Sequence, residues 1–277
     1  MKKGICFHFG YVYNDLEEQV KAIKNAGFDC VMTNADPNMA KENGTIKQQV
    51  ELFKKYGLEL SSLHMQYKRD DLPHFWHDNN IGKCLEKTLK KDVKIAKKYG
   101  FKCVVVHLRG EPNEVGYERL RRILKVCEKE KVPLAIENIG NNHCFFKVFE
   151  NIDSDWLKFC YDSGHNHAFD PQIDYLAKYG KKLEAVHLHD NLGPNPDEKK
   201  LKGLTSKKQS LDMHTLNKYG NIDWKKIAEK LSLINNSINL DYEVMMVYRK
   251  DETADETLKE VFNQACELEK LIEGFKV

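Results

Sequence analysis

Short apolar runs alternate with longer amphipathic, Lys/Glu-rich segments along the whole chain. The apolar runs are rich in valine, isoleucine, leucine and phenylalanine. This alternation is typical of parallel strands joined by right-handed crossover helices. We expect strands in eight runs, at residues 3–9, 28–34, 58–65, 101–108, 132–139, 157–163, 183–190 and 238–246.

The segments between these runs are expected to be helices. Several of them end in a glycine, in "NAG" at 25–27 and in "KYG" at 55–57, 98–100 and 178–180. A glycine just past the last turn adopts the left-handed cap at low cost. The expected helices lie near residues 14–26, 44–56, 80–99, 113–130, 145–152, 171–180, 223–234 and 253–273.

Eight strand–helix units in about 250 residues predict an α/β fold of the (β/α)8 TIM barrel type. We expect a single domain over residues 1–277, because no linker rich in proline, serine or glycine divides the chain. An open doubly wound sheet is the alternative, and it usually carries a Gly-rich phosphate loop after the first strand. The segment "HFGYVYND" supplies no such loop. We therefore expect no nucleotide cofactor.

Composition restricts the surroundings and partners of the protein. The 44 Lys+Arg and 42 Asp+Glu residues leave a charge of +2, which disfavours a nucleic-acid partner without excluding one. The sequence contains no run of about 18 apolar residues, so we expect no membrane-spanning helix. The N-terminus "MKKGICFHFG" lacks the features of a secretion signal. We expect a cytoplasmic protein with no membrane partner. Its eight cysteines form no CxxC pair and are expected to be reduced core thiols.

Polar residues gather where the predicted strands end. Buried strands of a parallel sheet should be almost wholly apolar, and active-site groups of a barrel come from the carboxyl ends of its strands. A single strand-end histidine is more often structural than functional, but seven of the eight expected strands carry a histidine or a carboxylate at this end. These residues are His8, His64, His107, Glu137, Asp162, His165, His187, His189, Asp190 and Glu243, with Asp212 and His214 in the loop at 191–222.

Carboxylates packed this closely would repel one another and raise each other's pKa, and a divalent cation removes that cost. The pattern therefore predicts a metal site. Imidazoles mixed with carboxylates suit Mn, Co, Fe, Zn or Mg. A site with two glutamates, one aspartate and one histidine favours Mn or Mg. The other histidines, His64, His107, His165 and His214, would suit zinc if more than one ion binds.

The strand-end motifs resemble those of a known superfamily. They are "HLRG", "AIENIG", "CYDSGH", "AVHLHDN", "DMHTLNKYGNIDW" and "YEVM". In order and spacing, over residues 3–273, they resemble the xylose-isomerase-like TIM barrel superfamily. That group contains sugar-phosphate isomerases and epimerases as well as apurinic endonucleases of the endonuclease-four type.

The resemblance implies a common metal site made of Glu137, Asp162, His187 and Glu243. It also implies counterparts for the family's further ligands, at His64, His107, His165, Asp212 and His214. In the endonuclease branch these residues would complete a three-zinc cluster, and all nine ligand types are present here. The same D-x-H stretch recurs in isomerase-like members, so the motifs leave the two branches open.

We expect a metal-dependent sugar isomerase or epimerase that removes a proton next to a carbonyl and stabilises an enediolate. The resemblance implies Glu137 and Glu243 as base and acid. Substrate contacts are expected from His8, Trp76, His107, Arg109 and His165. The small-molecule substrate would be a sugar, a sugar phosphate or a keto-polyol, and a lyase using the same proton abstraction is a variant. A homo-oligomer is compatible with the sequence.

Two other functions stay open. An endonuclease-four-like, multi-zinc hydrolase of abasic DNA would use Arg109, Arg119, Arg121, Arg122 and the lysines between Lys199 and Lys208. A barrel that only binds a sugar or metal is the third hypothesis. In "YDSGHNHAFD" we expect Asp162 and His165 to be ligands at a turn that ends the strand, with His167 incidental.

Overall fold

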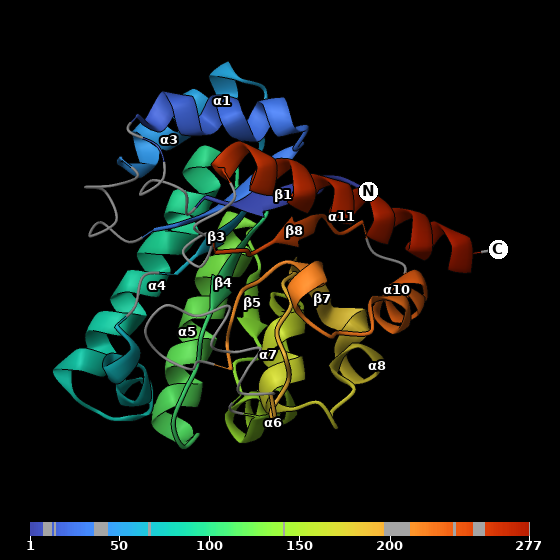
Figure 1. Ribbon diagram of the computed structural model, residues 1–277. Helices are drawn as coiled ribbons and strands as arrows, with labels where there is room; N and C mark the ends of the chain where they lie inside the picture. Colours follow the sequence, from blue (N-terminus) through green and yellow to red (C-terminus); the bar gives the residue numbers. More distant parts are fainter. Residues whose placement is uncertain are drawn as a thin grey trace.

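A computed structural model of the chain describes residues 1–7, 13, 15–35, 44–65, 68–140, 142–196, 211–234, 237–245 and 253–276. Eight parallel strands form its centre, with helices around them (Figure 1). The strands are β1 (Lys3–Cys6), β2 (Cys30–Asn34), β3 (Glu59–His64), β4 (Cys103–Val106), β5 (Leu134–Glu137), β6 (Leu157–Asp162), β7 (Leu183–His187) and β8 (Leu240–Tyr242). Each falls within an apolar run predicted from the sequence.

The sheet runs in the order β7-β6-β5-β4-β3-β2-β1-β8, and its two ends meet at Leu188. The amide of Leu188 donates to the Asp241 carbonyl at 2.8 Å, and its carbonyl accepts from the Glu243 amide at 2.9 Å. These bonds join the segment after β7 to β8 and close the barrel. The prediction of a single-domain (β/α)8 TIM barrel is confirmed, and the open doubly wound alternative is wrong.

The helices agree with the sequence pattern to within a few residues. Gly27 and Gly100 follow helix ends with φ of 113° and 95°, as expected of left-handed caps. Gly180 does not, because its φ of −55° continues the chain into a short 3-10 turn. The helices are α1 (Leu16–Ala26), α3 (Ile46–Lys55), α4 (Asn80–Tyr99), α5 (Glu114–Glu130), α6 (Asn142–Asn151), α8 (Tyr175–Tyr179), α10 (Trp224–Ser232) and α11 (Ala254–Phe275).

Among the described residues, two helical segments longer than three residues were not predicted. A 3-10 helix, η2 (Arg69–Trp76), follows β3, and α7 (Ser163–Phe169) follows β6 without a break. The Asp162 side chain caps α7 by accepting a hydrogen bond from the His165 amide at 2.6 Å. The expectation of a simple turn after Asp162 is therefore wrong, since the strand passes directly into a two-turn helix.

The barrel interior below the strand ends is filled by small side chains. Cys103, Val105, Ala135, Cys160 and Ala185 form a buried cluster there, separate from the main core between strands and helices. All eight cysteines are free, as expected, and Cys84 is exposed. Among the described residues, no helix is long and apolar enough to cross a bilayer.

Trp76 fixes η2 against the outside of the barrel. Its side chain is buried and donates from Nε1 to the Arg109 carbonyl at 2.9 Å, while Asn113 donates to the Trp76 carbonyl at 2.8 Å. The buried guanidinium of Arg119 donates to two further carbonyls beside η2. Gly116 of α5 lies directly under the indole, where a Cβ would come within 1.9 Å of Cε3.

Gly116→Ala should therefore destabilise the protein by about 1–3 kcal/mol, the usual cost of overpacking a filled site. Gly274→Ala is the matched control, because Gly274 is also helical but a Cβ there meets no atom within 4 Å. The control should gain up to about 1 kcal/mol from the higher helix propensity of alanine. Urea unfolding measures both free energies. Equal stability of the two variants would contradict the tight docking of Trp76 on α5.

Candidate metal centre

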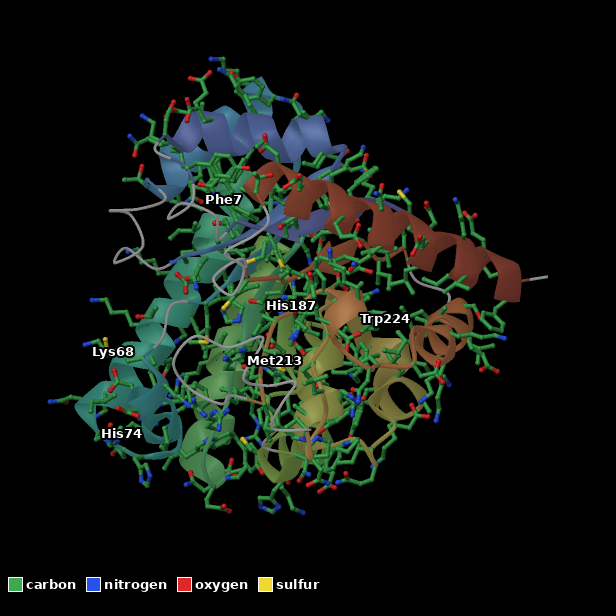
Figure 2. All side chains as sticks on the ribbon, in the orientation of Figure 1. Phe7, Lys68, His74, His187, Met213 and Trp224 are labelled. Carbon is green, nitrogen blue, oxygen red and sulfur yellow. The ribbon has the colours of Figure 1, made fainter. Side chains whose placement is uncertain are left out.

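The carboxyl ends of the strands bring the predicted polar residues together. His64, Glu137, Asp162 and His187 are the last residues of β3, β5, β6 and β7, and Glu243 follows β8 directly. Because all strands are parallel, these ends meet at one end of the barrel. His187 accordingly lies inside the ring of helices, whereas His74 lies at the periphery (Figure 2).

Glu137, Asp162, His187 and Glu243 form the first donor group, with one donor atom from each within 4.8 Å of the others. Nδ1 of His187 lies 3.1 Å from a carboxylate oxygen of Glu137 and 3.1 Å from one of Glu243. Among the described residues, neither carboxylate oxygen of Glu137 and neither ring nitrogen of His187 makes a well-aligned hydrogen bond. Buried polar atoms are rarely left this way. A shared cation would satisfy the Glu137 oxygens and Nδ1 of His187.

His64 and His107 form a second donor group with Glu137. Their Nε2 atoms lie 3.3 Å apart and approach the same Glu137 oxygen, at 3.5 Å from His64 and 3.1 Å from His107. Glu137 thus belongs to both groups. A carboxylate between two metal-donor groups is placed to bridge two ions.

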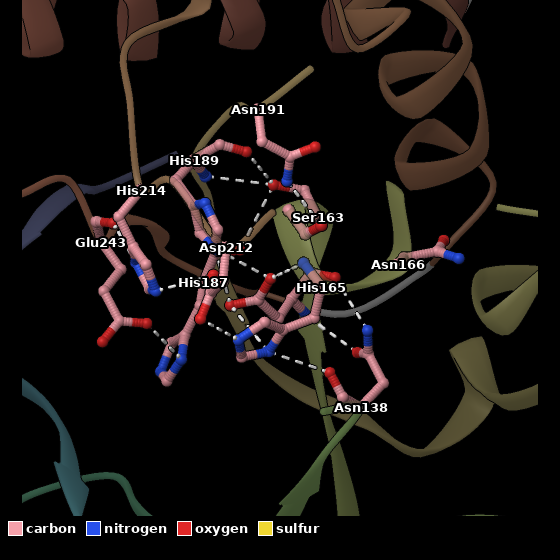
Figure 3. A network of polar contacts seen from close by, with 12 residues as sticks. Asn138, Ser163, His165, Asn166, His187, His189, Asn191, Asp212, His214 and Glu243 are labelled. Atoms are coloured by element: carbon pink, nitrogen blue, oxygen red, sulfur yellow. Dashed lines mark hydrogen bonds and ion pairs between the residues drawn. The ribbon is translucent and has the colours of Figure 1, made fainter. Parts of the chain in front are cut away.

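A third donor group consists of His165, His189, Asp212 and His214 (Figure 3). Asp212 lies 3.3 Å from Nε2 of His165 and 3.0 Å from Nε2 of His214. The segment after β7 returns to the barrel here, because Thr215 pairs with Asp190 in an antiparallel bridge. The D-x-H motif therefore reaches the same end of the barrel as the strand ends.

Backbone carbonyls fix the tautomers of three site histidines. A carbonyl only accepts, so the ring nitrogen facing it must carry the proton and the other nitrogen keeps a lone pair. Metal-binding histidines are usually held in this way. The Nδ1 contacts are His64 to the Met65 carbonyl at 3.1 Å, His165 to the Asn138 carbonyl at 3.1 Å and His214 to the Glu243 carbonyl at 2.9 Å.

The charges of the site are strongly coupled. Burial alone would raise the pKa of the Glu137 carboxyl, but His107 and His187 outweigh burial and hold this pKa well below its usual value. Burial would lower the pKa of His214, but Asp212 outweighs it and raises this pKa to about 9. Without an ion, protonated imidazoles therefore compensate the buried carboxylates. The mixed imidazole and carboxylate donors, with their lone pairs turned inward, fit a divalent metal ion.

A cavity of about 240 Å³ opens on this centre. It is lined by eight of the predicted metal or catalytic residues; Asp162 lies behind them, fully buried. The remaining residues that line the cavity were not predicted. Most of them come from the ends of β1 and β2. These residues are Cys6, Met32, Thr33, Asn34 and Met245.

Not all predicted substrate contacts reach the cavity. Arg109 donates to the Ile139 carbonyl at 3.0 Å, and neither Arg109 nor Trp76 lines the cavity. His167 also lies outside it, with Nε2 2.6 Å from Asn221. His8 and the lysines between Lys199 and Lys208 lie outside the described residues.

Sequence analysis gave His189 no role, yet it lies inside the site. It is fully buried, and Nε2 lies 3.0 Å from the Asp162 carboxylate. Side chains two residues apart in an extended chain point to the same face, so the sequence could have predicted that His189 lies on the same side as His187.

The protein is a parallel (β/α)8 barrel whose strand ends gather linked groups of side chains that could hold metal ions. More specifically, the chain belongs to the xylose isomerase-like TIM barrel family, whose profile matches residues 20–267. A curated relative, the uncharacterised protein y4fM of Sinorhizobium fredii, is 28% identical over 127 residues. The match covers 43% of this chain and 36% of y4fM, so the chain spans about a third of that relative.

Solved structures share the fold over nearly the whole chain. A D-tagatose 3-epimerase-like protein is 18% identical with a TM-score of 0.71, and covers 99% of both chains. A zinc-bound IolI protein has the same identity, coverage and TM-score. An L-ribulose 3-epimerase is 16% identical with a TM-score of 0.69, over 99% of this chain and 95% of its own. At these identities the likeness establishes the fold.

Zinc affinity of the metal-free protein should rise with pH from about 6.5 to about 9. His214 binds an ion only when neutral, and Asp212 raises its pKa to about 9. Below that pH binding must displace a proton, so affinity falls as the pH falls. Calorimetry with a competing chelator, in buffers of different ionisation enthalpy, measures affinity and proton release. His214→Gln should release fewer protons, and a pH-independent affinity in the unchanged protein would contradict the assignment.

Proposed function

We propose that the protein is a divalent-metal-dependent isomerase or epimerase that moves a proton next to the carbonyl of a sugar or keto-polyol. The observation that carries this proposal is the pair of Glu137 and Glu243. The two carboxylates come from β5 and β8, lie 3.1 Å from the same nitrogen of His187, and both line the cavity. Two such groups allow one to abstract a proton and the other to return a proton to the opposite face of a small substrate.

The residues divide the chemistry between them. Glu137, Asp162, His187 and Glu243 would hold a divalent ion, which would supply Lewis-acid polarisation of a substrate carbonyl. One glutamate could take the proton from the carbon, and the other, once protonated from solvent, could return a proton to the neighbouring carbon or to the opposite face. The first glutamate would then release its proton to solvent. His64, His107 and Asn34 line the cavity and can hydrogen-bond substrate hydroxyls.

The size and lining of the cavity support a small polyol substrate. Its volume of about 240 Å³ lies below the range of about 300–1,000 Å³ usual for drug-sized ligands. The lining combines imidazoles and an amide with two methionines and a cysteine. The D-tagatose 3-epimerase-like protein and the L-ribulose 3-epimerase that share the fold favour the same substrate class.

Glu243→Gln should lower proton exchange by about 10²–10⁴-fold, the usual contribution of a general acid or base. The measurement is deuterium incorporation from solvent into a panel of ketoses and keto-polyols at saturating Mn²⁺. Glu59→Gln makes the same chemical change at the exposed start of β3, where Glu59 pairs with Lys2, and should leave exchange unchanged. Full exchange by the folded Glu243→Gln protein would rule out the mechanism.

Hydrolysis of abasic DNA is a second candidate function. The specific observation in its favour is that the second and third donor groups accompany the first, with Glu137 shared between two of them. A multi-metal cluster can generate hydroxide and clamp a phosphodiester. Against it, no lysine or arginine lines the cavity among the residues that the structure describes. The overall charge of +2 also offers little attraction for a polyanion.

Metal content and one assay distinguish the two functions. We expect one Mn²⁺-like ion per chain to support proton exchange, and we expect no cleavage of an oligonucleotide that carries an abasic site. Three zinc ions per chain together with cleavage would favour the hydrolase instead. Elemental analysis of the purified protein and gel electrophoresis of a labelled oligonucleotide make the two measurements.

A further inference from the structure

His189 makes a direct hydrogen bond to one of the metal donors. Its Nε2 lies 3.0 Å and 3.1 Å from the two carboxylate oxygens of Asp162, and both side chains are fully buried. A carboxylate paired in this way only accepts, so Nε2 carries the proton and donates it. The hydrogen bond therefore sets the orientation of the Asp162 carboxylate.

A second contact shows that His189 does not share an ion with His214. A ring nitrogen of His189 lies within 4.8 Å of donor atoms of His165, Asp212 and His214. However, the His189 and His214 rings are stacked, with centroids 3.9 Å apart and planes inclined by 12° (Figure 3). An imidazole binds a metal in its own ring plane at about 2.0–2.1 Å, and one ion cannot lie in two parallel planes this far apart.

Contacts to both the backbone and the ring of His189 fix its position. Its amide donates to Ser163 Oγ at 3.0 Å, and that hydroxyl donates to the His189 carbonyl at 2.8 Å. Gly164 lies against the ring, and a Cβ there would come within 1.9 Å of Cε1. The first turn of α7, which also carries His165, thus holds the imidazole in place.

We propose that His189 is a positioning residue of the metal centre. It holds Asp162 of the first donor group by a hydrogen bond, and its ring packs face to face on His214 of the third group. Because this role concerns how the ion is held, it applies equally to an isomerase and to a hydrolase. Hydrogen bonds of this kind to metal ligands usually change metal affinity by about 10–100-fold when they are removed.

Two substitutions separate the hydrogen bond from the ring. His189→Gln keeps an N–H donor that reaches toward Asp162 but removes the ring. His189→Phe keeps a ring but removes the donor. His167→Gln is the control, because His167 lies on the same helix as His165 and contacts Asn221 outside the cavity. The measurements are zinc affinity of the metal-free proteins, by competition with a chromophoric chelator, and the number of ions bound.

We expect His189→Phe to bind the same number of zinc ions as the unchanged protein, with about 10–100-fold weaker affinity. His189→Gln and His167→Gln should stay close to the unchanged affinity. Unchanged binding by His189→Phe would overturn the proposal. Equal weakening of both His189 variants would also overturn it, and so would the loss of one ion, which would make His189 a ligand.

Nitrogen-15 NMR of the unsubstituted protein provides a test that does not depend on folding of the variants. With labelled histidine, the His189 ring should carry a proton at Nε2, with that proton shifted downfield by its hydrogen bond to Asp162. The opposite tautomer, protonated at Nδ1, would leave Nε2 without a proton to donate and would overturn the proposal.

Discussion

The site depends on the buried charge of Glu137. Its side chain is about 1% exposed, and imidazole nitrogens of His64, His107, His165 and His187 lie 3.1–3.5 Å from its oxygens. An ionised carboxylate is costly to bury unless positive groups compensate it. These imidazoles come from four different segments of the chain, so they reach Glu137 only when the barrel is closed. The same closure that buries the core therefore assembles the metal donors.

The sequence was sufficient for the strands and for most of the polar residues that gather at their carboxyl ends. A carboxylate or imidazole that ends a run of valine and isoleucine interrupts the apolar pattern that a buried strand requires, which is how Glu137 and His187 were found. Helix α7 was missed because its sequence, SGHNHAF, has no apolar periodicity and owes its start to the Asp162 cap. His189 was noted but given no role, because its partner Asp162 lies on another strand.

Loop conformation is the part that spacing could not predict. Trp76 follows β3 in the chain, where a barrel enzyme usually carries substrate contacts, yet hydrogen bonds from Asn113 and Arg119 hold η2 against α5. Those bonds are tertiary and leave no local signal in the sequence. The wall formed by Met32 and Asn34 was missed for the opposite reason. An apolar strand end and a neutral amide look like ordinary strand residues until closure places them opposite the carboxylates.

The shared carboxylate also relates the two candidate functions. The first donor group holds three carboxylates, whereas the second and third hold one each, and the one in the second is Glu137 itself. A first divalent ion would therefore bind most strongly to the first group. Once bound, it would neutralise part of the negative charge of Glu137, and the second group would then attract a second ion less strongly. Hard, oxygen-preferring Mn²⁺ or Mg²⁺ gains little from His64 and His107, so such an ion favours a single site. Zinc binds imidazole strongly, so it could occupy the second and third groups even though part of the Glu137 charge is already neutralised. The same side chains could therefore hold one ion, as the proposed isomerase requires, or several ions, as the hydrolase would require.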